Sequence, residues 1–469
     1  MTARAESEPG RHRAAILLTA VALTALALRL LAAWHANAHL PDDPSRLTGD
    51  ETNYDGLAYA LLQGAFFTWP GRAPLYPALL AGGYLAWDYS FAAVLYAQAV
   101  LATAVVPLTY LLARRCTLRR AVALGAAAIV AVHPALIRQV TRIDAAVLFT
   151  PLLLFTVLLL ERALRRERAE RAHVAAGAAL GLAALCQPTV LFLPLALPFA
   201  LPRTRTRRAR WRAWGAITGV MLLTIAPWSW HNWRTYHRVL PVSVSIAALW
   251  RGSPEFDALT RKGETIVDVF ATALNPARNG GHDPFTVDGD RWFTARGWHS
   301  IRAHPLAYAG YVARKPVYFW MGNRAGDWPG NRVFDVAALW RAEGAWKAVV
   351  DLAIRILPLA AVAALLVLRR RLGELRLLLV VLGYATVYHA LLYAEVRASE
   401  PWHPLLAILV AAAIGELAAR YAPSPAPAPR RITTYAMRRL VISDGHDTVG
   451  TSHTLPAQDP DRPPSAARS

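Results

Sequence analysis

The stretch AAILLTAVALTALALRLLAAW, residues 14–34, decides the fold class of this chain. It is about twenty residues long, which is the length that an α-helix needs to cross roughly 30 Å of hydrocarbon. The basic residues at 11–13 precede it and favour a cytoplasmic N-terminus. A signal peptide is the alternative, because Ala36-Asn37-Ala38 resembles a cleavage site. The apolar run is longer than an ordinary signal core, so a retained anchor is favoured, and the chain emerges outside in either case.

Further apolar runs follow along the 469 residues, of which 55% are hydrophobic. They occupy residues 90–112, 120–137, 144–160, 172–186, 188–201, 211–230, 346–368, 374–394 and 402–421. A soluble chain of this length would be less apolar and would divide into several domains. We therefore predict an all-α polytopic membrane protein, a helical bundle of about 10–11 transmembrane helices with loops on the outer face.

The formal net charge of +20 is concentrated in short basic clusters between the apolar runs. These clusters lie at 114–120, 162–171, 203–212 and 369–371. With a cytoplasmic N-terminus and about ten spans, all of them fall on the cytoplasmic side, as the positive-inside rule requires. The pattern is typical of a multi-pass plasma-membrane protein with both termini in the cytoplasm, and it argues against a nucleic-acid partner.

Two apolar segments do not fit a simple span. Residues 74–87 are too short to cross and contain Pro and Gly, so we expect an interfacial or re-entrant segment on the outer face. Residues 172–201 are interrupted by Gln187-Pro188, which predicts two short helices with an outward hinge. The predicted parts of the chain are a cytoplasmic N-terminus (1–13), a transmembrane catalytic module (14–230) with its first outer loop at 35–89, an outer-face segment (231–345), C-terminal transmembrane helices (346–421) and a disordered cytoplasmic tail (422–469).

The first outer loop holds the strongest candidates for chemistry. Asp50 and Glu51 are adjacent carboxylates just beyond the first span, where a carboxylate can act as a general base or orient a hydroxyl. A solvated acidic loop with a helix-capping Asp is the alternative. Arg72 and Tyr76 follow in Arg-Ala-Pro-Leu-Tyr-Pro, where the arginine either binds phosphate or lies in a turn with its charge at the interface.

Four more candidates lie on the same predicted side. Asp144 opens a span, where it binds substrate or simply caps the helix. His231 and Arg234 end the seventh run among tryptophans, which fits either a lipid-phosphate contact or an interfacial aromatic belt. Arg397 stands in a short, charge-dense turn. No spacing of ligands demands a metal, so no cofactor is expected, although acidic outer loops are able to bind a divalent cation.

Taken in order, these motifs resemble the GT-C superfamily of membrane glycosyltransferases, most of all the family 39 type, which includes protein O-mannosyltransferases and lipid A aminoarabinose transferases. The resemblance covers most of 14–421. It rests on Gly49-Asp50-Glu51, Arg72 to Pro77, Asp144 to Phe149, Gly181 to Pro188, Pro227-Trp228 with Asn232, His304 to Tyr308, and Arg397 with Pro401 and Pro404. Relatives often carry a basic residue where Gln187 stands, an Arg at His231 and a Tyr at Ala398.

The resemblance implies an inverting transfer of a hexosyl or pentosyl group from a polyprenyl-phosphate carrier to a protein, glycan or lipid acceptor at the outer face of the membrane. Asp50 would be the base, with Glu51 supporting it, while Arg72, Arg234 and Arg397 would neutralise the departing phosphate. The main alternative is a polytopic transporter or lipid flippase, which predicts an internal repeat and charges near mid-membrane. No clear repeat is visible, and most charges lie at the outer rim.

Overall fold

The computed structural model describes residues 8–37, 42–67, 69–117, 119–165, 170–202, 206–261, 281–322 and 345–421. Within these ranges the secondary structure is α-helix and short 3-10 helix, with no β-strand. The protein is therefore an all-α polytopic membrane protein, as the sequence predicts. Residues 1–420 form one compact unit. The tail at 422–469, predicted to be disordered, lies outside the described residues.

The predicted runs before the outer segment are helical in the structure. The elements are α1 (Glu8–Asn37), η1 (Pro44–Arg46), α2 (Asp50–Leu62), α3 (Leu75–Trp87), α4 (Phe91–Thr103), α5 (Val105–Thr117), α6 (Arg120–Val132), α7 (Pro134–Arg138), η2 (Gln139–Thr141), α8 (Ala146–Arg165), α9 (Glu170–Cys186), η3 (Pro188–Val190), α10 (Leu193–Ala200) and α11 (Arg207–Tyr236). The hinge expected at Gln187-Pro188 separates α9 from α10. The short segment 74–87 is α3, which packs against α2.

The outer segment and the C-terminal part are also helical where the structure describes them. Their elements are α12 (Ala248–Arg251), α13 (Pro254–Arg261), α16 (Val287–Ala303), α17 (Pro305–Met321), α19 (Ala345–Val367), α20 (Arg376–Leu391), η4 (Val396–Trp402) and α21 (His403–Tyr421). The last three predicted runs therefore correspond to α19, α20 and α21.

Length and composition single out some of these helices as membrane spans. In the described ranges, four helical stretches are long and apolar enough to cross alone: Gly10–Asn37, Phe91–Thr117, Ala146–Arg165 and Val396–Tyr421. A fifth is the pair Arg120–Val132 and Pro134–Thr141, which is bent by 51°. The sequence predicts one unbroken run at 120–137, but Pro134 has no N–H to donate and disfavours helical backbone at His133. Shorter apolar helices at Leu352–Val367 and Arg376–Leu391 account for two more predicted runs.

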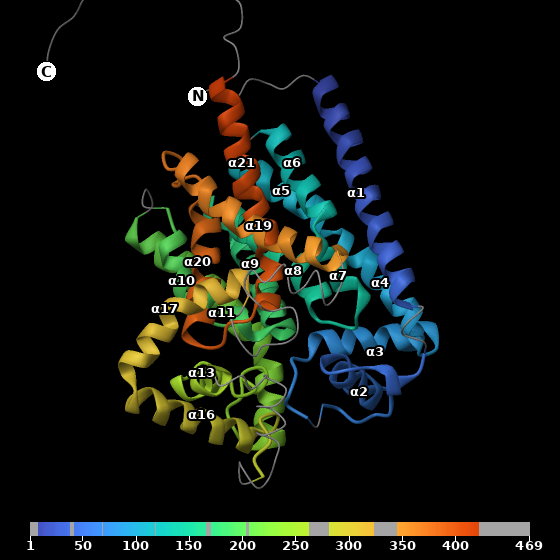
Figure 1. Ribbon diagram of the computed structural model, residues 1–469, viewed down its shortest axis with the longest axis vertical. Coiled ribbons are helices and arrows are strands. Elements are labelled where there is room, and N and C mark those ends of the chain that lie inside the picture. The colour runs from blue at the N-terminus through green and yellow to red at the C-terminus, as the bar shows by residue number, and fades with distance from the viewer. Residues whose placement is uncertain are drawn as a thin grey trace, which may run out of the picture. The chain divides into compact units, whose positions relative to one another are not determined.

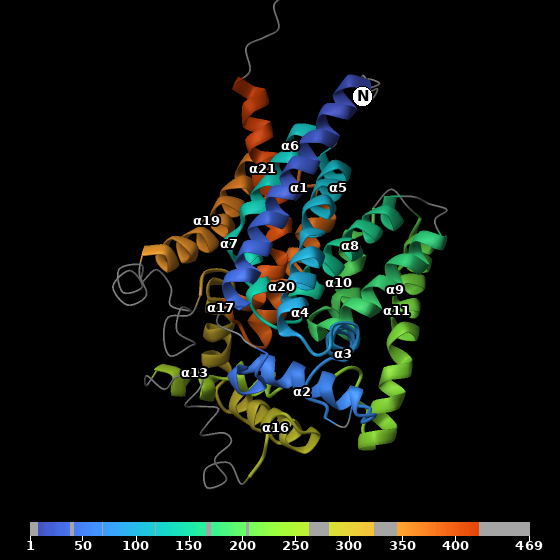
Figure 2. The same cartoon turned by 90° about the vertical axis from the view of Figure 1, so that its right-hand side faces the viewer.

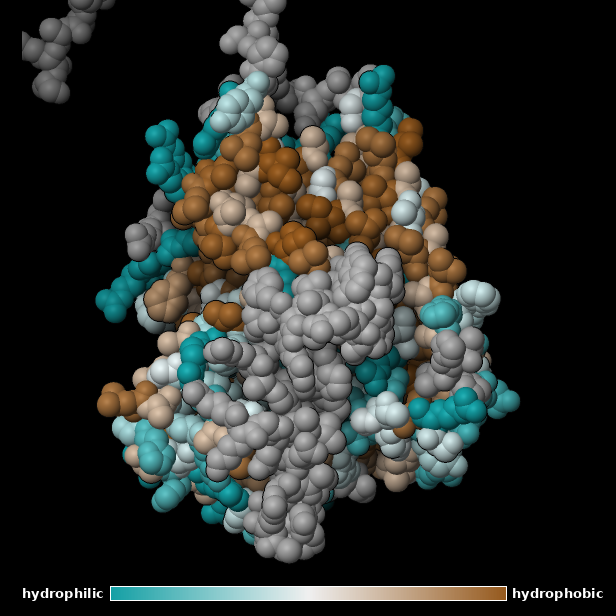
Figure 3. Space-filling model, in the orientation of Figure 1, coloured by the Kyte–Doolittle hydropathy of each residue, from teal (hydrophilic) through white to brown (hydrophobic). Residues whose placement is uncertain are grey.

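The spans connect two chemically different ends of this unit. The start of α1, the α5–α6 connection and the end of α21 lie at one end, whereas α2, α3, α13 and α16 lie at the other (Figures 1 and 2). Apolar residues cover the surface over α21, α6 and α1, as expected for a face in contact with lipid tails (Figure 3). This apolar belt lies between the two ends.

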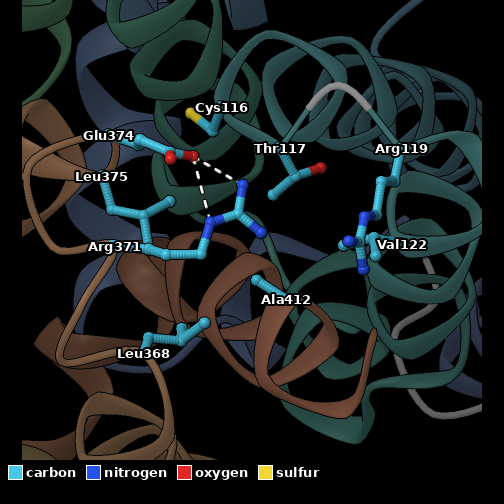
Figure 4. Close-up of a pocket in the computed structure, with 9 residues that line it drawn as sticks. All are labelled: Cys116, Thr117, Arg119, Val122, Leu368, Arg371, Glu374, Leu375 and Ala412. Atoms are coloured by element: carbon cyan, nitrogen blue, oxygen red, sulfur yellow. Dashed lines mark hydrogen bonds and ion pairs between the residues drawn. The ribbon is translucent and has the colours of Figure 1, made fainter. Parts of the chain in front are cut away.

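The first of these ends, which we call the basic end, collects two of the predicted basic clusters. Arg119 donates to the Gly415 carbonyl oxygen at 3.1 Å, and Arg371 pairs with Glu374 at 2.6 Å. A small pocket opens here between α5, α6, the α19–α20 turn and α21 (Figure 4). It is lined by Cys116, Thr117, Arg119, Val122, Leu368, Arg371, Glu374, Leu375 and Ala412.

Close helix packing holds α9 against α11. A Cβ atom at Gly177 would lie 2.6 Å from the Ile217 carbonyl oxygen, and one at Gly181 would lie 2.5 Å from Thr224 Cβ. Glycines spaced by one helical turn let two helix backbones approach within a membrane, where packing rather than the hydrophobic effect drives association. This contact fixes the direction of α11, which carries two predicted site residues.

Arg29 in the first span does not reach the interface. Its side chain is 0% exposed, and its guanidinium donates to the carbonyl oxygens of Ala25 and Ala131 at 3.2 Å. Ala131 is in the last turn of α6, where carbonyl groups lack helical partners and the helix dipole is negative. The buried charge therefore caps α6 at its break.

Candidate active site

Asp50 begins α2 and joins two arginines that are distant in sequence. Gly49 precedes it with φ of 59°, a backbone conformation that favours glycine. Arg72 Nη2 forms a short ion pair with Asp50 Oδ1, and Arg397 Nη2 lies 2.8 Å from Asp50 Oδ2. We call these three residues the Asp50 cluster. Each carboxylate oxygen of Asp50 thus has its own guanidinium.

Aromatic rings hold the Arg72 guanidinium in place. Its Cζ atom lies 5.4 Å from the centre of the Tyr54 ring and 5.8 Å from that of Phe285. Trp69 stacks on Phe285 with the ring centres 5.6 Å apart. Gly71 makes room for this arrangement, because a Cβ there would lie 2.3 Å from the Trp69 ring. Such cation–π contacts keep a guanidinium charged and oriented.

Arg397 is positioned by the η4 turn. Its Nε atom lies 3.6 Å from a Glu395 oxygen. Glu400, three residues later, is buried and forms a short ion pair with Arg138 of α7. His403 Nδ1 is 3.2 Å from His133 Nε2, which ties the start of α21 to the α6–α7 break. The turn therefore presents Arg397 from a firmly anchored backbone.

The arginines keep Asp50 ionised. Burial alone would raise the pKa of Asp50, but the positive charges of Arg72 and Arg397 outweigh it and hold the pKa below its ordinary value. The charge of Arg251 contributes in the same direction. In this state Asp50 is a carboxylate with little tendency to take a proton.

Glu51 lies behind the cluster. Its side chain is 5% exposed and accepts hydrogen bonds at 3.3 Å from Thr48, from Arg142 and from the backbone N–H of Ile143. It thus joins the first loop to the loop before α8. Asp144 caps α8, since its Oδ1 accepts from Ala146 N–H at 2.8 Å.

Tyr76 is also a supporting residue. It is 2% exposed, and its hydroxyl donates to Gln98 of α4. The Tyr54 ring meets it edge to face at 4.9 Å between centres. Tyr76 therefore backs the ring that contacts Arg72.

His231 and Arg234 lie on α11, away from these contacts. His231 Nε2 is 3.3 Å from the Phe67 carbonyl oxygen, and its ring packs on Trp228 and Phe66. Arg234 is exposed. In the described part of the chain, neither residue forms a hydrogen bond, ion pair or ring contact with the Asp50 cluster.

The structure adds residues that the sequence argument missed. Tyr54 and Phe285 contact the Arg72 guanidinium, the charge of Arg251 acts on Asp50, and Tyr393 contacts Arg251. The one available signal was their proximity in sequence to candidate elements, as for Tyr393 before Arg397. Among the residues described, no group of three or more His, Cys, Asp or Glu side chains is placed to hold a metal ion.

The fold and this cluster define a class: a polytopic helical membrane protein with a carboxylate–arginine site at one end of its bundle. Residues 71–231 match the family of dolichyl-phosphate-mannose-protein mannosyltransferases. The match includes Arg72, Tyr76, Asp144 and His231. A comparison with curated proteins gives no match.

Three solved structures are similar to this chain. The apo oligosaccharyltransferase of Archaeoglobus fulgidus aligns with a TM-score of 0.55 and 16% identity, over 88% of this chain and 52% of that one. The oligosaccharyltransferase AglB from Archaeoglobus fulgidus, in complex with an inhibitory peptide and a dolichol-phosphate, aligns with a TM-score of 0.53 and 15% identity, over 88% of this chain and 51% of that one. ArnT from Cupriavidus metallidurans bound to undecaprenyl phosphate aligns with a TM-score of 0.40 and 15% identity, over 87% of this chain and 78% of that one.

The chain spans about half the length of the archaeal structures that it matches. The likeness to them is one of fold, and together with the family match it confirms the resemblance to the GT-C superfamily of membrane glycosyltransferases.

Proposed function

We propose that this protein is an inverting glycosyltransferase that moves a sugar from a polyprenyl-phosphate carrier to an acceptor hydroxyl at the outer face of the membrane. The observation that carries this proposal is the convergence of Arg72 and Arg397 on the two oxygens of Asp50. The family match and the dolichol-phosphate bound by the structurally similar AglB support a lipid-phosphate donor.

In this mechanism the carrier phosphate competes with Asp50 for the guanidiniums. Arginine binds phosphate through paired N–H donors. The phosphate of the donor is a diester with one negative charge, and it gains a second charge as the sugar leaves. Once Arg72 and Arg397 bind the phosphate, Asp50 loses the partners that lower its pKa and becomes a stronger base. Donor binding therefore prepares the base that the acceptor requires.

The chemical step is a single displacement. The acceptor hydroxyl gives its proton to the Asp50 carboxylate, and its oxygen forms a bond to the anomeric carbon from the face opposite the phosphate. The bond from that carbon to the phosphate oxygen breaks, and polyprenyl phosphate leaves with the electron pair. Arg72 and Arg397 stabilise the charge that develops on the leaving phosphate.

The remaining predicted residues take supporting roles in this proposal. Glu51, Asp144 and Tyr76 hold the loops that carry the cluster. His231 and Arg234 on α11 contact the lipid-linked substrate at the membrane surface. The acceptor is a protein, glycan or lipid, the sugar is a hexose or pentose, and the protein resides in the plasma membrane with both termini cytoplasmic.

The test is transfer of labelled sugar from polyprenyl-phosphate donors to endogenous acceptors in membranes that contain the protein. Wild type and the basic-end variant Glu374→Gln are expected to form product, whereas Asp50→Asn is not. Full transfer by Asp50→Asn would show that the base is assigned wrongly.

A transporter or lipid flippase remains the second candidate, favoured by the buried His133–His403 pair and Arg29 inside the bundle. It predicts that the intact donor appears on the opposite face of sealed vesicles, without any glycosylated product. That outcome would replace the transferase proposal.

A further inference from the structure

The outer segment 231–345 meets the C-terminal helices in a tight backbone junction. Gly252 caps α12, and Leu392 caps α20. A Cβ atom at Gly252 would lie 1.9 Å from the Leu392 carbonyl oxygen. Only glycine allows these two chain segments, 140 positions apart by number, to touch backbone to backbone at this point.

A single lysine joins the two sides of this junction. Lys315 of α17 donates from Nζ to the carbonyl oxygens of Gly252 and Leu392, both at 2.7 Å. The side chain is 0% exposed, and Nζ lies 4.4 Å from the centre of the Tyr311 ring. Burial lowers the pKa of Lys315 to about 7. A neutral amine still has two hydrogens for the two carbonyls, so the contact survives deprotonation.

The residues next to the junction are an arginine and a tyrosine that contact each other. Arg251 immediately precedes Gly252, and Tyr393 immediately follows Leu392. Arg251 Cζ lies 3.4 Å from the centre of the Tyr393 ring, the closest cation–π contact described. Four residues after Tyr393 comes Arg397, and the charge of Arg251 acts on Asp50. The two carbonyls that Lys315 binds thus belong to the residues next to Arg251 and Tyr393 in sequence.

We propose that Lys315 is a positioning residue that holds Arg251 against Tyr393, so that Arg251 joins Arg72 and Arg397 in binding the phosphate of the donor. The outer segment is then part of the donor site and not only a cover for the acceptor. This inference rests on the proposed function, because it assigns Arg251 to the same phosphate.

The experiment measures sugar transfer by the full-length protein with Arg251→Gln, Lys315→Met and the double variant. Arg251→Gln is expected to lower kcat/KM for the donor about 10- to 100-fold, because one charged hydrogen-bonding partner of the phosphate is lost. Lys315→Met is expected to lower it about tenfold. The double variant is expected to be no worse than Arg251→Gln alone, because Lys315 acts through Arg251.

A matched control removes the neighbouring charge. Arg314 precedes Lys315 on α17 and pairs with Asp257 at 3.1 Å, without reaching either carbonyl. Arg314→Met is therefore expected to transfer sugar like wild type. If Lys315→Met does not accumulate in membranes, Tyr393→Leu replaces it, alone and combined with Arg251→Gln. Tyr393→Leu leaves both carbonyl contacts of Lys315 in place.

Two results would overturn the proposal. One is unchanged donor kcat/KM in Arg251→Gln. The other is that Lys315→Met, or Tyr393→Leu in its place, lowers kcat/KM by the same factor whether or not Arg251→Gln is also present. That result would mean that the residue acts through the stability of the protein and not through Arg251. Either result, with Asp50→Asn still inactive, removes this inference and leaves the proposed function standing. The absence of any sugar transfer by wild type would instead remove the proposed function.

Discussion

Arginine–carboxylate clusters occur at both ends of the bundle, and they are built differently. At the basic end, Arg371 pairs with Glu374 three residues later and with Glu416 of α21 at 3.4 Å, and Arg420 pairs with Glu416 four residues earlier. At the other end, Asp50 pairs with Arg72 and Arg397, which are 22 and 347 residues away. Two of the three pairs at the basic end join residues within four positions of each other, whereas both pairs of the Asp50 cluster join residues from distant segments. The geometry of the Asp50 cluster therefore depends more strongly on the whole fold.

The largest effect expected from this comparison is at Asp50. Asp50→Asn keeps the shape but cannot accept the acceptor's proton, so we expect a loss of about 10²- to 10⁴-fold in kcat. The measurement is initial rates of sugar transfer at saturating donor, with protein amounts matched by immunoblot. Glu374→Gln, the equivalent change at the basic end, is the control. Equal losses of kcat in Asp50→Asn and Glu374→Gln would show that the Asp50 cluster has no special role in transfer.

The next effect concerns the arginines. Arg397→Gln and Arg72→Gln each remove one phosphate partner and are expected to lower kcat/KM for the donor about 10²- to 10³-fold. Arg397→Lys retains the charge but not the paired N–H donors, so it should recover part of this loss. Arg371→Gln at the basic end should change the rate less than twofold. Full activity of both glutamine variants would contradict the assignment of the phosphate site.

A smaller effect appears in the pH dependence. The kcat/KM profile reports free enzyme, in which the arginines hold the pKa of Asp50 below its ordinary value of about 3.9. The kcat profile reports the donor complex, in which the phosphate has taken those arginines. We therefore expect the acid limb of kcat to lie at higher pH than that of kcat/KM. In Arg397→Gln the acid limb of the kcat/KM profile should move to higher pH. If the acid limbs of kcat and kcat/KM coincide in wild type, the phosphate does not compete with Asp50 for the arginines.

The same lowered pKa has a consequence for folding. Because the folded-state pKa of Asp50 is below its unfolded value, the ionised carboxylate contributes stability above a pH of about 3.9, and this is lost as the pH falls through the folded pKa.

The smallest effect is expected at the basic end. The Glu374 side chain is 53% exposed, and exposed ion pairs contribute less than about 1 kcal/mol to the free energy of unfolding. Glu374→Gln should accordingly leave the Tm in detergent almost unchanged, whereas Glu400→Gln, which leaves Arg138 without its buried partner, should lower it by several degrees. A larger fall in Tm for Glu374→Gln than for Glu400→Gln would show that burial does not decide which ion pair contributes more stability.

Sequence patterns predicted the helices well because membrane spans are set by length and apolarity, which need no knowledge of neighbours. The hinge at Gln187-Pro188 could be predicted from its proline, and the separate segment 74–87 could be predicted from its short length. The bend at His133-Pro134 was missed, although proline again explains it. The partners of the buried Arg29 could not be predicted from sequence, because only the structure shows the position of the α6 carbonyls.

The site could be predicted less completely. Asp50, Arg72 and Arg397 could be grouped from sequence alone, because all three lie on the same predicted side of the membrane. Arg251 and Phe285 could not be found this way, because they lie in a segment whose path is set by tertiary packing and not by periodicity. Glu51 and Tyr76 were named as site residues, and the contacts that bury them are visible only in three dimensions.

The central claim is that the Asp50 cluster and the basic end lie on opposite sides of the membrane, with Asp50 outside. Both native cysteines are buried, so single cysteines at exposed positions report sidedness directly. Thr52→Cys lies beside the cluster, and Gly373→Cys lies at the basic end, both exposed. With a membrane-impermeant maleimide on intact spheroplasts, the account predicts labelling of Thr52→Cys at once and of Gly373→Cys only after permeabilisation. Labelling of Gly373→Cys alone in intact spheroplasts would contradict it.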